Sequence, residues 1–196
     1  TYSLFERTFK DWGLDTRYAD LTKAETLKDL IDAKTRLIFF ETITNPQLEV
    51  VDVEELSKIA KAKGILLVAD TTLTPPYIFN SRDFGVDIEV LSSTKYISGG
   101  ATSVGGLIID NGTYDWSKSK LKADAKKYGN FAFINKLRRE VYRNVGVCLS
   151  PQNAFLQSVG LETLPLRVDV SCANTLKIAG FLKNSPKVKS VDYPGL

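Results

Sequence analysis

The sequence has no histidine, no methionine and only two cysteines among its 196 residues. Without histidine, the chain by itself cannot form a Ser-His-Asp or Cys-His nucleophile system or an H-E-x-x-H zinc site. Proton transfer by this chain must therefore use a carboxylate, a lysine, a tyrosine or a bound cofactor. Because no initiator methionine is present and the opening residues TYSLF resemble the interior of a protein, we expect the chain to be part of a longer one.

An excess of one charge and long apolar runs are also missing. The chain has 26 basic and 23 acidic residues, a net charge of +3, which is too small for the one-sided field that nucleic-acid binding requires. The longest apolar runs, residues 37–40 and 65–69, fall far short of the roughly 20 residues of a membrane-spanning helix. We expect neither a nucleic-acid partner nor a membrane span.

The two cysteines, Cys148 and Cys172, form no C-x-x-C motif, and we expect no signal peptide. Both features favour a reducing, cytoplasmic location. We expect both side chains to be buried thiols rather than reactive groups.

The order of apolar patterns predicts an α/β fold. Apolar residues at helical spacing in residues 24–34 precede the strand-like run 37–40, and a second helical pattern from Val53 ends at Gly64 before the run 65–69. Shorter strand-like runs follow at 88–91 and 107–109. This alternation is typical of a mostly parallel sheet with helices on both faces.

Helical patterns dominate the rest of the chain. We expect helices over residues 131–143, after Ser150-Pro151, and over about 168–183, then a short strand at 188–191. Near residue 120 the sequence is rich in lysine, and a solvated surface is a better interpretation than a site for an anionic ligand. These lysines are Lys118, Lys120, Lys122, Lys126 and Lys127.

Candidate site residues follow the strand-like runs, because open parallel sheets bind ligands beyond the carboxyl ends of their strands. Asp70 follows one run, and Ser92, Thr94 and Lys95 follow another, ahead of the glycine-bearing stretch 98–106. Asp70 alone would also suit a magnesium-binding strand of a nucleotide hydrolase. However, both G-x-x-x-x-G-K-[ST] and the dinucleotide motif G-x-G-x-x-G are absent.

An acid, a lysine and two hydroxyls without histidine fit pyridoxal phosphate. A lysine amine condenses with the aldehyde of this cofactor and can later serve as the acid/base group. Asp70 would keep the ring nitrogen protonated, and Ser92 and Thr94 would donate to the phosphate. Each residue taken singly has an ordinary explanation as a turn residue, a backbone partner or a solvated lysine, so only the combination favours a cofactor site.

Several separated motifs, in order along the whole chain, resemble the Cys/Met-metabolism family of pyridoxal-phosphate enzymes. The motifs are ETITNP at 41–46, VADTT with TPPY at 68–77, SSTKYI at 92–97, GG at 105–106 and SPQNAFLQSVGLETLPLR at 150–167. The resemblance implies the three-layer large domain of fold-type I, the fold of aspartate aminotransferase. It assigns residues 1–185 to that domain and 186–196 to the start of a smaller C-terminal domain.

The resemblance also implies a role for each of six residues. These are Lys95 as the Schiff-base lysine, Asp70 as partner of the pyridine nitrogen, Ser92 and Thr94 as phosphate ligands, Asn45 near the phenolic oxygen, and Thr72 as the threonine of the family's D-N-T motif. The sequence departs from the family pattern at two positions: Thr71 replaces the usual asparagine, and Gly100 replaces a common histidine.

Within the family, ATSVGG at 101–106 and FAFINKLR at 131–138 are most similar to the O-acetylhomoserine sulfhydrylases. That similarity implies γ-replacement on an amino-acid ester by sulfide or a thiol, in a homodimer or homotetramer. A γ-lyase or cystathionine γ-synthase is the nearest alternative, and a non-catalytic α/β interaction domain is the alternative of another class. Family members are about twice this length and hold a phosphate loop, a ring-stacking tyrosine and a carboxylate-binding arginine outside the matching region.

Overall fold

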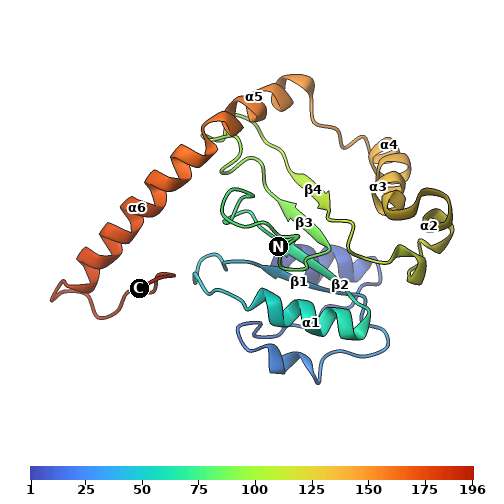
Figure 1. Ribbon diagram of the computed structural model, residues 1–196, viewed down its shortest axis with the longest axis horizontal. Coiled ribbons are helices and arrows are strands. Elements are labelled where there is room, and N and C mark those ends of the chain that lie inside the picture. Colours follow the sequence, from blue (N-terminus) through green and yellow to red (C-terminus); the bar gives the residue numbers. More distant parts are fainter.

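The computed structural model describes residues 1–196, and a four-stranded sheet lies at its centre (Figure 1). The strands are β1 (Leu37–Glu41), β2 (Leu66–Asp70), β3 (Ile88–Leu91) and β4 (Leu107–Asp110), in the spatial order β1-β2-β3-β4. The first three are parallel, and β4 runs antiparallel to β3. The predicted α/β class is confirmed, and every strand begins and ends within one residue of its apolar run.

Helix α1 (Val53–Lys63) covers one face of the sheet. It begins at Asp52, whose side chain accepts a hydrogen bond from the Glu55 amide at 2.9 Å, and it ends at Gly64 with φ of 65°. A positive φ at this position is easily adopted only by glycine, as the sequence predicted. Leu56 and Leu67 are the largest side chains that this face buries completely.

The opposite face is covered by the segment after β4. Trp116 and Ala132 are buried against Val68 and Ile88, and the Trp116 ring stacks on Phe133 at a centroid distance of 5.0 Å. This segment contains the 3-10 helices Trp116–Lys118 and Gly129–Phe131, α2 (Lys122–Tyr128) and α3 (Ala132–Lys136). Helices therefore lie on both faces, as predicted.

The helical second half of the chain is also confirmed. The π-helical turns Leu137–Tyr142 and α4 (Arg143–Val145) continue α3, so one helical rod spans the predicted region 131–143. Helix α5 (Pro151–Glu162) begins at Ser150, whose hydroxyl accepts from the Asn153 amide at 3.2 Å. Helix α6 (Leu164–Lys183) starts four residues earlier than predicted and extends beyond the sheet (Figure 1).

The helix predicted over residues 24–34 is wrong. Only a 3-10 helix, Ala24–Leu27, forms there, and the rest consists of turns. The Asp32 carboxylate accepts from the amides of Lys34 and Thr35 and pairs with Arg17, whose hydrogen bond lowers the pKa of Asp32 to about 2. The hydrogen bonds of the Asp32 side chain stabilise a turn of the backbone instead of a helix. Leu27 and Ile31 nevertheless pack into the core beside α1.

Two further predictions are wrong. Residues 188–191 form no strand, since the Val188 amide donates to the Ser185 carbonyl in a turn and all four strands pair only with one another. Cys148 and Cys172 are exposed rather than buried. Cys148 lies in the loop between α4 and α5. Cys172 lies on α6, beyond Leu164 and Val168, the residues near the start of this helix that pack into the core. A short π-helix, Leu4–Phe9, near the start of the chain was not predicted.

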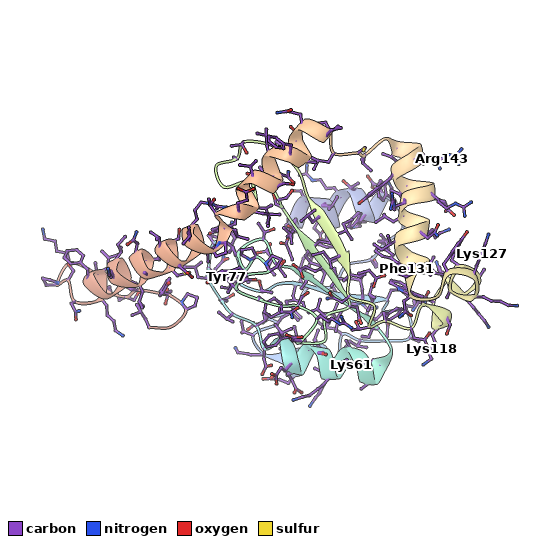
Figure 2. The ribbon with its side chains drawn as sticks, turned by 45° about the horizontal axis from the view of Figure 1, so that its top comes forward. Lys61, Tyr77, Lys118, Lys127, Phe131 and Arg143 are labelled. Carbon is purple, nitrogen blue, oxygen red and sulfur yellow. The ribbon has the colours of Figure 1, made fainter.

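The lysines near residue 120 are all exposed, which confirms the solvated surface, and Lys118 and Lys127 point outward (Figure 2). A cavity of about 690 Å³ lies at the amino-terminal edge of β1 and β2, lined in part by Arg36, Lys63 and Lys118. None of the predicted site residues lines it. No helix in the structure combines the length and the apolar character needed to cross a membrane.

Leu56→Ala should lower the free energy of unfolding of the full-length protein by about 2–5 kcal/mol, because it leaves a cavity between α1 and β2. The matched control is Lys58→Ala, an exposed position on the same helix, which should change it by less than about 0.5 kcal/mol. Urea unfolding followed by circular dichroism measures both. Equal effects of the two variants would contradict the assignment of this face to the core.

Candidate functional site

The parallel register brings three predicted site segments to one edge of the sheet. Glu41 pairs with Asp70, and Asp70 pairs with Val90, so β1, β2 and β3 end side by side. Asn45 follows β1, Asp70 ends β2 and Ser92 follows β3. The structure therefore places these three segments as the sequence predicted.

Hydrogen bonds join Asp70, Thr72 and Ser92. The Thr72 amide donates to Oδ1 of Asp70 at 2.9 Å, and the Ser92 amide donates to Oγ1 of Thr72 at 2.9 Å. Thr72 thus links the loops after β2 and β3. Two groups remain without a hydrogen bond to the chain, the second carboxylate oxygen of Asp70 and the hydroxyl of Ser92. Both residues are half-buried, so each keeps access to a ligand.

Thr94 uses its hydroxyl differently. Its Oγ1 accepts from the Gly105 amide at 2.9 Å and donates to the Gly105 carbonyl at 3.2 Å. A Cβ at Gly105 would lie 2.3 Å from Nε2 of Gln157 and 2.8 Å from Oγ of Ser93, so a larger residue there would displace these side chains. Thr94 therefore holds the glycine stretch in place, and its proton is already engaged, unlike that of Ser92.

Lys95 lies in the turn after β3. Its amide donates to the Ser92 carbonyl at 3.2 Å, and the Ser98 amide closes the turn on the Ser93 carbonyl at 2.9 Å. The Lys95 side chain is exposed and forms no ion pair or hydrogen bond within the chain. It lines an open cavity of about 690 Å³ together with Thr94, Tyr96, Gly99, Gly100, Ala101, Leu166, Arg167, Val170 and Ser171.

Asn45 is the least constrained of the six residues. It is exposed, its amide donates to Oε2 of Glu41 at 3.1 Å, and its side chain makes no hydrogen bond within the chain. It shares the sheet edge with Asp70 but lines neither of the two cavities described above. At the departure Gly100, a Cβ would meet only the Thr102 side chain at 3.9 Å, so space does not demand glycine there.

Gly160 and Arg167 lie against the turn that carries Lys95, although the sequence assigned them no role. A Cβ on Gly160 would lie 2.2 Å from the Ile97 carbonyl oxygen, so α5 packs directly on the backbone of the turn. The Arg167 guanidinium donates to the Gly160 carbonyl at 2.7 Å and to Oγ1 of Thr163 at 3.0 Å. Both residues lie in the GLETLPLR stretch, and their close approach to the turn is a long-range contact that local spacing does not reveal.

A second contact ties the loop after β2 to α6. The Tyr77 hydroxyl donates to both carboxylate oxygens of Asp169, at 3.1 and 3.2 Å, and Figure 2 shows Tyr77 beside this helix. The hydrogen bond and the negative charge of Asp169 raise the pKa of Tyr77. Loops from two strands, those carrying Tyr77 and Lys95, therefore rest on the helices α5 and α6.

A family model described as Cys/Met metabolism PLP-dependent enzyme matches residues 1–196. The chain belongs to this family. Among curated members, it is 38% identical to the O-acetyl-L-homoserine sulfhydrylase of Leptospira meyeri, covering 100% of this chain and 49% of the relative. It is 33% identical to the cystathionine beta-lyase of Coxiella burnetii, again over 100% of this chain and 46% of the relative. The chain spans about half the length of the curated family members that it matches.

Solved structures of the family share the fold. The O-acetylhomoserine sulfhydrylase of Wolinella succinogenes matches with a TM-score of 0.92 and 49% identity, covering 100% of this chain and 56% of that one. An O-acetylhomoserine (thiol)-lyase of Campylobacter jejuni matches with a TM-score of 0.88 and 33% identity, covering 100% of this chain and 51% of that one. The Campylobacter structure carries an N'-pyridoxyl-lysine-5'-monophosphate. The mixed sheet seen here is thus the fold-type I sheet that the resemblance implied.

The residues at the sheet edge fit pyridoxal phosphate, the cofactor of this family. The free Lys95 amine, the free oxygen of Asp70 and the free Ser92 hydroxyl are the three group types that the aldehyde, the ring nitrogen and the phosphate require. Asp70 and Ser92 are half-buried at adjacent strand ends, and Lys95 is exposed and lines a cavity, so all three groups remain accessible to a cofactor.

Gly160→Ala should lower the free energy of unfolding of the full-length protein by about 1–3 kcal/mol, because the new methyl group collides with the Ile97 carbonyl. Gly180→Ala is the matched control, since a Cβ added at this glycine within α6 would meet nothing within 4 Å. It should raise the free energy of unfolding by up to about 1 kcal/mol, because alanine favours a helix interior. Thermal unfolding measures both, and effects of the same sign would contradict the close packing of α5 on the Lys95 turn.

Proposed function

We propose that this chain forms the cofactor-holding part of an O-acetylhomoserine sulfhydrylase that depends on pyridoxal phosphate. The observation that carries the proposal is the hydrogen-bonded series Asp70, Thr72 and Ser92 at adjacent strand ends, joined to the turn that carries Lys95 by the hydrogen bond from the Lys95 amide to the Ser92 carbonyl. The choice of reaction is supported by relatives from Leptospira and Wolinella that are named as sulfhydrylases.

We assign Lys95 and Asp70 tasks that their surroundings support. When bound, pyridoxal phosphate supplies an aldehyde that bonds to amines and a ring that accepts electrons. Lys95 would make the covalent attachment through its free amine and, once released, would move protons at the α and β carbons of the substrate. Asp70 would hold a proton at the ring nitrogen with the oxygen that Thr72 leaves free.

The phosphate would be bound chiefly by Ser92, whose hydroxyl is free, while Thr94 would contribute mainly by holding Gly105. Asn45 is proposed to lie near the phenolic oxygen, because its side-chain amide group makes no hydrogen bond within the chain and its loop follows the strand next to β2. Thr72 would contribute without contacting the cofactor, by fixing Asp70 relative to Ser92.

The proposed reaction replaces the acetoxy group of O-acetylhomoserine by sulfide or a thiol. With sulfide, a carbon–sulfur bond forms at the γ carbon, the carbon–oxygen bond breaks, and homocysteine and acetate are released. We further propose a homodimer or homotetramer in the cytoplasm, with residues 1–185 in the large domain and 186–196 at the start of a smaller one. The free state of both cysteines agrees with a reducing location.

Borohydride reduction of the full-length protein loaded with pyridoxal phosphate should fix the cofactor on Lys95. Mass spectrometry of peptides should find the reduced adduct on the segment SSTKY and not in Lys95→Ala. Lys118→Ala, which removes an exposed lysine of the basic region, is the matched control and should label like the wild type. An adduct on another lysine, or none, would overturn the assignment of Lys95.

The full-length protein should form homocysteine and acetate from O-acetylhomoserine in the presence of sulfide. Lys95→Ala should lower kcat by roughly a thousandfold, because the proton-transfer group is lost, and Lys118→Ala should leave it unchanged. Release of an α-keto acid and ammonia from methionine or cystathionine would instead identify a lyase. Homocysteine formation by the wild type and Lys118→Ala, with its loss in Lys95→Ala, would exclude a non-catalytic domain.

A further inference from the structure

We propose that the buried carboxyl group of Glu89 is a positioning group for Asp70 and acts through Thr71. The inference rests on the proposed function, in which Asp70 contacts the cofactor ring. It explains why a carboxyl side chain lies in the middle of β3, between the apolar strands β2 and β4.

Glu89 is enclosed, with 3% of its surface exposed, and it takes part in none of the five ion pairs of the structure. Both carboxyl oxygens are held by hydroxyl groups. Thr71 donates to Oε1 at 2.6 Å, and the Ser81 hydroxyl donates to Oε2. Burying a carboxyl group without partners is costly, so these two hydrogen bonds determine how Glu89 is accommodated.

Thr71 is fixed at three points. Its amide donates to the Val90 carbonyl at 3.0 Å, its carbonyl accepts from the Thr74 amide at 3.0 Å, and its hydroxyl binds Glu89. The side chain is fully buried. Consecutive side chains of an extended segment point to opposite sides, so Thr71 faces the α1 side with Ala69, and Asp70 faces the other. Glu89 therefore reaches Asp70 only through the backbone.

Through that backbone, the effect passes to the atoms of the site. Thr71 lies between Asp70 and Thr72, and the Thr72 amide is the donor that orients the Asp70 carboxylate at 2.9 Å. If Thr71 shifts, Thr72 shifts with it, and the amide no longer points at Oδ1. The hydroxyl of Thr71, at the position where the resemblance expects asparagine, thus has a partner in Glu89.

The second oxygen of Glu89 accepts a hydrogen bond from Ser81, which belongs to a different segment of the chain. Ser81, 2% exposed, accepts from Nδ2 of Asn111 at 2.9 Å, and the same amide group donates to the Val86 carbonyl at 2.9 Å. These contacts hold the segment before β3 and the end of β4. Because the two hydrogen bonds share one carboxyl group but anchor different segments, Ser81→Ala is a matched control for changes at Thr71.

The test compares Thr71→Val, Thr71→Ser and Ser81→Ala in the full-length protein, with two measurements. Hydrogen exchange of the Thr72 amide in the protein without cofactor reports the Asp70 turn directly. The dissociation constant of pyridoxal phosphate, from its absorbance on titration, reports the site. Thr71→Val should speed exchange at Thr72 and weaken cofactor binding roughly fivefold to tenfold, the effect of one lost buried hydrogen bond. Thr71→Ser should stay near wild type, and Ser81→Ala should change both less than Thr71→Val, because the hydrogen bond between Thr71 and Glu89 remains.

The inference is overturned if Thr71→Val leaves Thr72 exchange and cofactor affinity unchanged, or if Ser81→Ala changes both as much. If valine prevents folding, Thr71→Ala replaces it, and the difference between Thr71→Ala and Thr71→Ser isolates the hydroxyl. A wild-type protein that binds no pyridoxal phosphate overturns the proposed function and this inference together. If the wild type binds pyridoxal phosphate and Thr71→Val has the same cofactor affinity and the same Thr72 exchange, the inference alone is overturned.

Discussion

The parallel register of β1, β2 and β3 is the constraint on which the rest of the site depends. It makes Glu41, Asp70 and Val90 neighbours, so the loops that follow three separate strands begin at one edge. The apolar faces set this register, because a shift by one residue would turn Leu67 and Ala69 away from α1. The register that buries the core therefore also places the polar groups at one edge of the sheet. The antiparallel β4 closes the sheet and returns the chain toward α2 and α3.

The sequence predicted the elements whose signals are local. Strand β2 is a dense apolar run ended by an acid, and α1 has an apolar face that ends at a terminal glycine, so both were found within one residue. The helix predicted over 24–34 failed because apolar spacing alone does not report that Asp32 binds two following amides. The strand predicted at 188–191 failed because a strand needs a partner, and spacing within so short a segment does not supply one.

The candidate site divides in the same way. Asp70, Ser92 and Lys95 could be found because each lies at or just after a strand end, but the tasks of Thr72 and Thr94 as links between loops depend on hydrogen bonds across 20 and 11 residues. Gly160 and Arg167 come from α5 and α6 and meet the Lys95 turn only after folding. Glu89 looks like an interruption of an apolar strand in the sequence, and only the fold shows its two hydroxyl partners.

The distribution of hydrogen bonds separates supporting residues from binding residues. Thr71, Thr72 and Thr94 each use a hydroxyl within the chain itself, and each thereby fixes a loop. The Lys95 amine, the Ser92 hydroxyl and one oxygen of Asp70 stay free at the same edge. A fold in which the threonines carry the internal hydrogen bonds can leave its lysine, serine and aspartate available without losing rigidity. That division explains how a site can be preorganised by the chain and still present unpaired polar groups to a ligand.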